Sequence, residues 1–283
     1  MELALNGRFD LRDGDADVLI QVSGGSLLWQ KERLLNVALS ALPPECDTVA
    51  WVDCDLVFLR DDWPRALQRQ LEHSALVQLF RDFHYLPVSA DAAARSARAP
   101  GLSRQSLAYL VSRGRVPANV FLTRGASVKW GYVPGGAWGA RRSTLDATGF
   151  YDPDILGYGD KLLVSAAYGR HRDAMRAVCM NTRQSEHYER WARQFCALVA
   201  GRVGHIDGEV LHLWHGELDR RQYSTRFDGF SRFDFDPEND IARTDDGAWR
   251  WNSDKPELQH FVRRYFELRG DGDQHRTAVQ IPT

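Results

Sequence analysis

A continuous apolar run, Thr48–Val52, ends in two aspartates, Asp53 and Asp55, that are separated by one residue. The run has the length of a buried strand, and a second apolar run at 17–22 fits the same interpretation. Between them, residues 27–42 carry apolar side chains close to helical spacing, and two prolines follow. A strand, a helix and a strand in this order predict a parallel crossover unit, and therefore a chain of the α/β class.

The rest of the pattern adds helices and strands but no second domain. The stretch 88–118, rich in Ala, Ser and Arg, is expected to be a mobile loop around one helix, and residues 269–283 to be frayed. No linker composition divides the chain, so we predict one domain at 1–255 with a C-terminal helix and tail at 256–283. Further strands are expected at 75–80 and 209–213, and helices at 63–73, 106–112, 143–149, 159–167, 185–200 and 256–268.

The charge balance and the apolar pattern narrow the class of partner. The chain carries 36 basic and 38 acidic residues, a net charge of −2, so it presents no overall basic field for nucleic acid. No apolar run approaches the roughly 20 residues of a membrane-spanning helix, and the N-terminus lacks the pattern of a secretory signal. Four cysteines without CxxC spacing fit free thiols in a reducing compartment. We therefore expect a cytoplasmic protein with no transmembrane segment and no nucleic-acid partner.

The aspartate pair at the end of the apolar run is the strongest local sign of chemistry. Open α/β sheets bind ligands at the carboxyl ends of their strands, and residues two apart on a strand point the same way. Asp53 and Asp55 can therefore meet one hard divalent cation, with a nucleotide diphosphate completing its coordination. The alternative is a solvated strand end or a pair of helix-capping carboxylates.

Two histidines at a spacing of three, His212 and His215, lie in the segment LHLWHG at 211–216. They can ligate a metal together, or one of them can pair with the Asp53/Asp55 site. The alternative for either residue is a structural imidazole whose hydrogen bonds are satisfied in the fold.

Three further segments carry candidate binding or catalytic residues. In GYVPGGAWG (131–139), Gly135 and Gly136 allow close approach of a ligand and Trp138 offers a face for a sugar, or else the segment is a tight turn with a core tryptophan. In GYGD (157–160), Asp160 can take a proton from an acceptor hydroxyl, or it caps the next helix. In WQKERLLN (29–36), the basic side chains can reach a diphosphate and the asparagine a nucleoside, or they form a solvated helix face. The candidates of this last segment are Lys31, Arg33 and Asn36.

Taken in order, these segments resemble nucleotide-sugar glycosyltransferases of the GT-A fold. The order is WQKERLLN, then VDCD, then GGAWGARRSTLDATGFYD leading into GYGD, and then HLWHG with Arg220, Tyr223 and Arg226 behind it. The galactosyltransferase-like branch is the most similar, and the resemblance covers about residues 17–241. It implies one Rossmann-like domain with a mixed, mostly parallel sheet flanked by helices, and a chain that starts at the second strand of that fold.

The resemblance also implies roles for the candidate residues. Asp53 and Asp55 match the pair that holds Mn²⁺ or Mg²⁺ against the donor diphosphate, with His215 as the later metal ligand and His212 in reserve. Asp160 matches the catalytic base. The remaining positions match the loop between donor and acceptor (Gly135, Gly136 and Trp138) and the helix beside the donor nucleotide (Asn36, with Lys31 or Arg33). The expected reaction moves a sugar from a nucleotide-sugar donor, such as a UDP-sugar, to a hydroxyl of a carbohydrate or glycoconjugate acceptor.

Two other functions remain open at this point. A non-catalytic nucleotide- or carbohydrate-binding protein on the same fold needs the same cleft without turnover. A haloacid-dehalogenase-like phosphatase would use Asp53 as nucleophile and Asp55 as acid/base in its DxDxV loop. That class also needs a later pair of acidic metal ligands, and Asp160 is followed by KLLV, which lacks the second acid.

Overall fold

The apolar run at 48–52 forms strand β3 (Thr48–Val52), but its partner comes from far along the chain. In the computed structural model, which describes residues 1–87 and 101–270, β3 pairs antiparallel with β9 (Ala137–Arg141). The earlier apolar run forms only the short β2 (Gln21–Ser23), which pairs with β1 (Glu2–Ala4) in a separate sheet. The predicted parallel crossover around helix α1 (Lys31–Ala41) is therefore wrong, because apolar spacing predicts a strand but not the strand that completes it.

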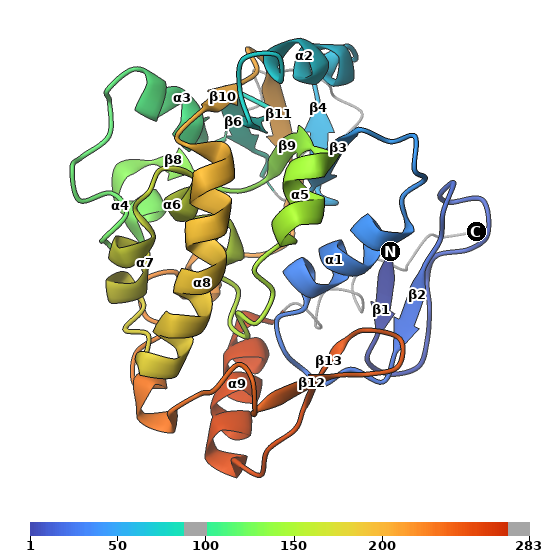
Figure 1. The fold of residues 1–283 in the computed structure, drawn as a ribbon, viewed down its shortest axis with the longest axis vertical. Helices are drawn as coiled ribbons and strands as arrows, with labels where there is room; N and C mark the ends of the chain where they lie inside the picture. Colours follow the sequence, from blue (N-terminus) through green and yellow to red (C-terminus); the bar gives the residue numbers. More distant parts are fainter. Residues whose placement is uncertain (88–100, 271–283) are drawn as a thin grey trace.

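Two larger sheets form the centre of the molecule, and both mix strand directions (Figure 1). Four of the nine strand pairs in the described residues are parallel and five are antiparallel, so the sheet is mixed but not mostly parallel. The α/β class with mixed sheets and flanking helices is confirmed. The four-stranded sheet has the order β10 (Val203–His205), β5 (Leu76–Gln78), β9 and β3, and the five-stranded sheet has the order β4 (Leu56–Phe58), β11 (Glu209–His212), β6 (Asp82–Tyr85), β7 (Ser103–Ser106) and β8 (Tyr132–Val133).

The expected helices are all present, α6 with the expected bounds and the others with shifted ends. Helix α6 (Gly159–Ala167) is buried along almost its whole length, because α8 (Thr182–Val199) packs against it and the Tyr188 hydroxyl donates to the Leu162 carbonyl at 2.7 Å. The other predicted helices are α2 (Trp63–Gln70), α3 (Leu107–Ser112), α5 (Arg142–Thr148) and α9 (Pro256–Arg269). Two short helices were not predicted, α4 (Ala126–Trp130) and α7 (His171–Ala177). The predicted loop residues 88–100 and the tail residues 271–283 lie outside the described residues.

The C-terminal part of the chain is tied into the same core. The β12 (Ile241–Arg243) and β13 (Trp249–Trp251) pair lies beside β1 and β2 (Figure 1), and the Ser26 N–H donates to the Trp249 carbonyl at 2.9 Å. Helix α9 buries Leu258, Val262 and Tyr265 in the main hydrophobic cluster.

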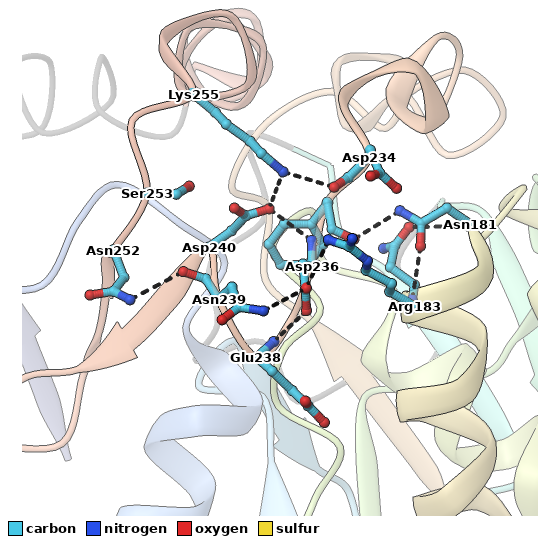
Figure 2. A network of polar contacts seen from close by, with 12 residues as sticks. Asn181, Arg183, Asp234, Asp236, Glu238, Asn239, Asp240, Asn252, Ser253 and Lys255 are labelled. Carbon is cyan, nitrogen blue, oxygen red and sulfur yellow. Dashed lines mark hydrogen bonds and ion pairs between the residues drawn. The ribbon is translucent and has the colours of Figure 1, made fainter.

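A polar network fixes the start of α9 to the start of α8 (Figure 2). Lys255 donates at 2.8 Å to the buried Asp240 carboxylate, which also accepts from the Asp236 N–H at 2.7 Å. The Asp236 carboxylate in turn binds Arg183 of α8 at 3.1 Å, and Asn181 caps α8. Basic side chains and N–H groups supply hydrogen bonds to both carboxylates, so we interpret this network as part of the structure that connects α8 with α9 and not as a binding site. Among the described helices, none has the length and hydropathy that crossing a membrane requires.

Candidate functional site

A single cleft collects most of the predicted site residues. It is a cavity of about 170 Å³ between the β3–β4 turn, the β8–β9 turn, the start of α6 and the segment after β11. Glycines let this wall close tightly: a Cβ on Gly135 would lie 2.4 Å from the Asp160 carboxylate, and one on Gly159 would lie 2.1 Å from Glu32. The predicted residues that line the cleft are Asp53, Asp55, Gly135, Gly136, Asp160, His212 and His215.

Asp55, His212 and His215 converge at one edge of this cleft. The Asp55 Oδ2 atom lies 2.8 Å from His215 Nε2 and 3.4 Å from His212 Nε2, and the two Nε2 atoms are 3.1 Å apart. Strand β11 places His212 at its end, and the chain returns His215 three residues later. We call these three residues the Asp-His-His triad, and each of them offers one ligand atom to a common point.

The Asp55 carboxylate has a charged surrounding and an unused oxygen. Burial raises the pKa of Asp55, but hydrogen bonds from His212 and His215 and their charges outweigh burial and hold the pKa well below its ordinary value. The other oxygen, Oδ1, is buried and has no hydrogen-bond partner. A buried carboxylate oxygen without a donor is costly in a folded protein, so this atom is free for a further ligand.

An arginine contacts the triad at His215. The Arg221 guanidinium contacts His215 Nδ1 and lies 3.2 Å from His215 Nε2. It comes from a short 3-10 helix (Asp219–Arg221) in the segment after β11 and lines the same cleft. A positive charge therefore stands directly beside the proposed ligand atoms.

The second predicted carboxylate, Asp53, has a different partner from Asp55. Its Oδ1 atom lies 2.8 Å from Lys31 Nζ, which also lies 3.1 Å from Asp160 Oδ2. Residues 53–55 form a turn and not an extended strand, so the expectation that Asp53 and Asp55 face one point is not met. Asp53 instead joins Lys31 and Asp160, an arrangement that we call the Lys31 cluster.

Burial shapes the protonation of the Lys31 cluster. Burial lowers the pKa of Lys31, but the negative charges of Asp160, Asp53 and Glu32 outweigh it and hold the pKa well above its usual range. Burial raises the pKa of Asp53, which Lys31 opposes. The neighbouring Glu32 has its pKa raised to about 8, chiefly by burial, and accepts a hydrogen bond from the Trp29 indole at 2.8 Å. Lys31 thus stays charged and holds the Asp160 carboxylate at the cleft. Asp160 lies in the first turn of α6 and does not cap it, since the cap position belongs to Tyr158.

Three predicted site residues have structural roles outside the cleft. Trp138 is completely buried and its indole donates to the Pro134 carbonyl at 3.1 Å, so it has no face for a sugar. Arg33 is buried in an ion pair with Asp152 at 2.8 Å, and Asn36 donates to the same carboxylate at 2.8 Å. Neither Arg33 nor Asn36 lines the cleft, because both side chains hold α1 against the loop after α5.

Other residues of the cleft were not singled out from the sequence. Arg104 comes from β7, a short polar strand without an apolar pattern, and Tyr85 comes from β6, whose alternation of polar and aromatic residues spans only four positions. Lys161 is buried beside Asp160, and burial lowers its pKa to about 7. Arg226 also lines the cleft. In the sequence it belongs to the pattern after HLWHG, and its short distance along the chain from His212 and His215 could have predicted that it lies near them. Comparisons with models of protein families, with curated proteins and with solved structures find no match for this chain.

Proposed function

We propose that this protein is a metal-dependent glycosyltransferase that moves a sugar from a nucleotide-sugar donor to a hydroxyl acceptor. One observation carries the proposal: the Asp-His-His triad and the Lys31-held Asp160 face the same cleft. A cation site and a carboxylate that can receive a proton are the two parts that metal-assisted glycosyl transfer needs.

The triad fits a divalent transition metal. Ligand atoms at about 2.1 Å from a metal lie roughly 3.0–3.4 Å from one another, and the three atoms of the triad lie 2.8–3.4 Å apart. Two imidazoles with one carboxylate favour Mn²⁺ over Mg²⁺, which prefers oxygen ligands. The other oxygen of the same carboxylate, Asp55 Oδ1, has no hydrogen-bond partner among the residues that the structure describes. When bound, the cation supplies positive charge that offsets the charge building on a leaving diphosphate.

The protein's own residues perform the other tasks. Asp160 receives the proton of the acceptor hydroxyl, and Lys31 orients its carboxylate toward the cleft until the acceptor arrives. Gly135 lets the backbone approach the Asp160 carboxylate, and Gly136 lets it approach Phe80 and Phe83, so both glycines shape the wall of the cleft beside Asp160. Arg221 adds a charge-assisted donor for a diphosphate oxygen next to the triad.

The phosphatase interpretation receives little support from this geometry. In that class the residue two after the nucleophile must be free to exchange protons with substrate, whereas both histidines bind Asp55. A binding protein without turnover fits the cleft equally well, and the test below separates it from an enzyme.

The test is release of nucleotide from a set of UDP-sugars, measured with and without Mn²⁺ and with mixed carbohydrate acceptors. We expect Mn²⁺-dependent release that falls by about 10²- to 10⁴-fold in Asp160→Asn. UDP binding in the presence of Mn²⁺ should be unchanged in that variant. Binding of UDP with no release from any sugar, equal in wild type and Asp160→Asn, would identify a binding protein instead.

A further inference from the structure

Two arginines of the cleft are left without a carboxylate partner. Arg104 and Arg226 both line the cleft, and for each the Nε atom is buried without a hydrogen-bond partner. In the described part of the chain no ion pair joins either guanidinium to an acid. We call these two residues the arginine pair.

The contrast with Arg33 shows that the fold does pair buried arginines elsewhere. Arg33 is 8 % exposed and forms an ion pair with Asp152 at 2.8 Å, whereas Arg226 is 6 % exposed and forms none. The charge of Arg226 lowers the pKa of the nearby Asp154. The Asp154 carboxylate, however, accepts its hydrogen bonds from the backbone N–H groups of Leu156 and Tyr158 and not from Arg226. A buried guanidinium without an ion-pair partner is costly, so an anion from outside the protein is the expected complement.

Aromatic rings hold both guanidinium groups at the cleft. Arg104 lies over the Tyr85 ring at 5.5 Å, and Arg226 lies over Tyr223 at 5.4 Å. Burial raises the pKa of Tyr85 to about 12, and Arg104, Tyr223 and Arg221 all act on it. Arg226 joins this group through its contact with the Tyr223 ring, and all five side chains line the same cleft. Stacked, preset guanidinium groups suit planar or tetrahedral oxyanions.

The charges around the proposed donor site balance the donor diphosphate without help from the arginine pair. A divalent cation bound by Asp55 keeps one positive charge, and Arg221 beside His215 adds a second. Together they balance the two negative charges of a diphosphate ester. The Lys31 cluster, with one lysine and two aspartates, adds one negative charge. One positive charge of the arginine pair is then left over for the other substrate.

We infer that the acceptor carries an oxyanion, a carboxylate, phosphate or sulfate, which binds to Arg104 and Arg226. This inference rests on the proposed function for the identity of the donor, but the anion site itself stands on two guanidinium groups that no carboxylate pairs with in the described residues. Their hydrogen bonds go to neutral acceptors, the Ser127 carbonyl at 3.3 Å for Arg104 and the Tyr265 hydroxyl at 3.2 Å for Arg226. The acceptor class would then be an acidic sugar or a phosphorylated or sulfated one, and not a neutral sugar.

The test measures binding of glucuronate, glucose 6-phosphate and neutral glucose by calorimetry, with Mn²⁺ and UDP present at saturation. We expect at least one of the two charged sugars to bind about tenfold or more tightly than glucose. Arg104→Gln should weaken that binding about 10- to 100-fold and leave UDP affinity unchanged. Arg113→Gln is the matched control, because Arg113 also lies over a tyrosine ring, at 5.6 Å from Tyr109, but does not line the cleft. Arg226→Lys, which keeps the charge of the buried position, serves as the second variant and should weaken binding without loss of folding.

The outcomes are distinct. Equal affinity for glucose and both charged sugars, or no binding of any of them, overturns the inference. Binding of the charged sugars that is seen without UDP and lost when UDP is added overturns it too, because the arginine pair would then serve the donor. If UDP fails to bind while a charged sugar still does, the proposed function fails and the arginine pair remains an anion site.

Discussion

Replacing Asp55 by asparagine tests which residues hold the cation. Structural metal sites with four ligands gain about 10–16 kcal/mol of apparent binding free energy, or about 2.5–4 kcal/mol for each ligand. At about 1.4 kcal/mol for each factor of ten, loss of one ligand weakens binding about 100- to 1000-fold. Mn²⁺ binds less tightly than Zn²⁺ to the same donors, so we expect the lower end, about 100-fold, for Asp55→Asn.

Asp53→Asn is the matched control for this experiment, because it makes the same change two residues away. Asp53 binds Lys31 at 2.8 Å and contributes no atom to the Asp-His-His triad, so its loss should change Mn²⁺ affinity by no more than about threefold. Titration of the protein into Mn²⁺, followed by the electron paramagnetic resonance signal of free Mn²⁺, gives both affinities, and circular dichroism confirms folding. Equal weakening by the two substitutions would refute the triad and favour the adjacent aspartate pair as the cation site.

Three more substitutions test other parts of the site. Glu32 has its pKa raised to about 8, above its unfolded value, so its contribution is present at low pH and is lost as pH rises toward 8. Urea midpoints of Glu32→Gln should therefore fall less than those of wild type between pH 5.5 and 8.5, and parallel falls would contradict this. Trp138→Phe should cost about 1–3 kcal/mol in urea unfolding through its lost hydrogen bond and volume, with UDP affinity unchanged, whereas weaker UDP binding would restore a ligand role. Gly135→Ala places a Cβ 2.4 Å from the Asp160 carboxylate and should lower turnover about 100-fold, with Gly208→Ala, outside the cleft, as a near-neutral control.

The sequence predicted elements better than their arrangement. Long apolar patterns located α1, α6, α8 and α9 because the face that each helix buries is written in its own spacing. Strand β7, with the sequence SRQS, carries no such signal and exists because β6 and β8 pair with it on either side. The antiparallel partner of β3 lies more than eighty residues away, and its identity depends on tertiary packing that no local pattern encodes.

The sequence named the residues that line the candidate site better than it indicated which side chains contact one another. Asp55, His212 and His215 lie together because β11 runs antiparallel to β4 and pairs His212 with Leu56, directly after Asp55. Neither the ion pair of Arg33 nor the burial of Trp138 follows from residue type, since an arginine on a helix face and a tryptophan in a Gly-rich loop fit solvent and core equally well.

The protons of the triad show how Arg221 and a cation compete for one histidine. A neutral imidazole has one donor and one acceptor nitrogen, and a guanidinium has only donors. In the tautomer in which His215 Nδ1 accepts from Arg221, the ring proton is on Nε2, where it can be donated to Asp55 at 2.8 Å. A metal held by His215 would need the lone pair of that same Nε2, so the ring proton would then be on Nδ1 and Arg221 would have to turn away from it. A diphosphate that draws Arg221 away thus favours metal binding, and the metal in turn frees Arg221 for the diphosphate, so the two ligands are expected to bind with positive cooperativity.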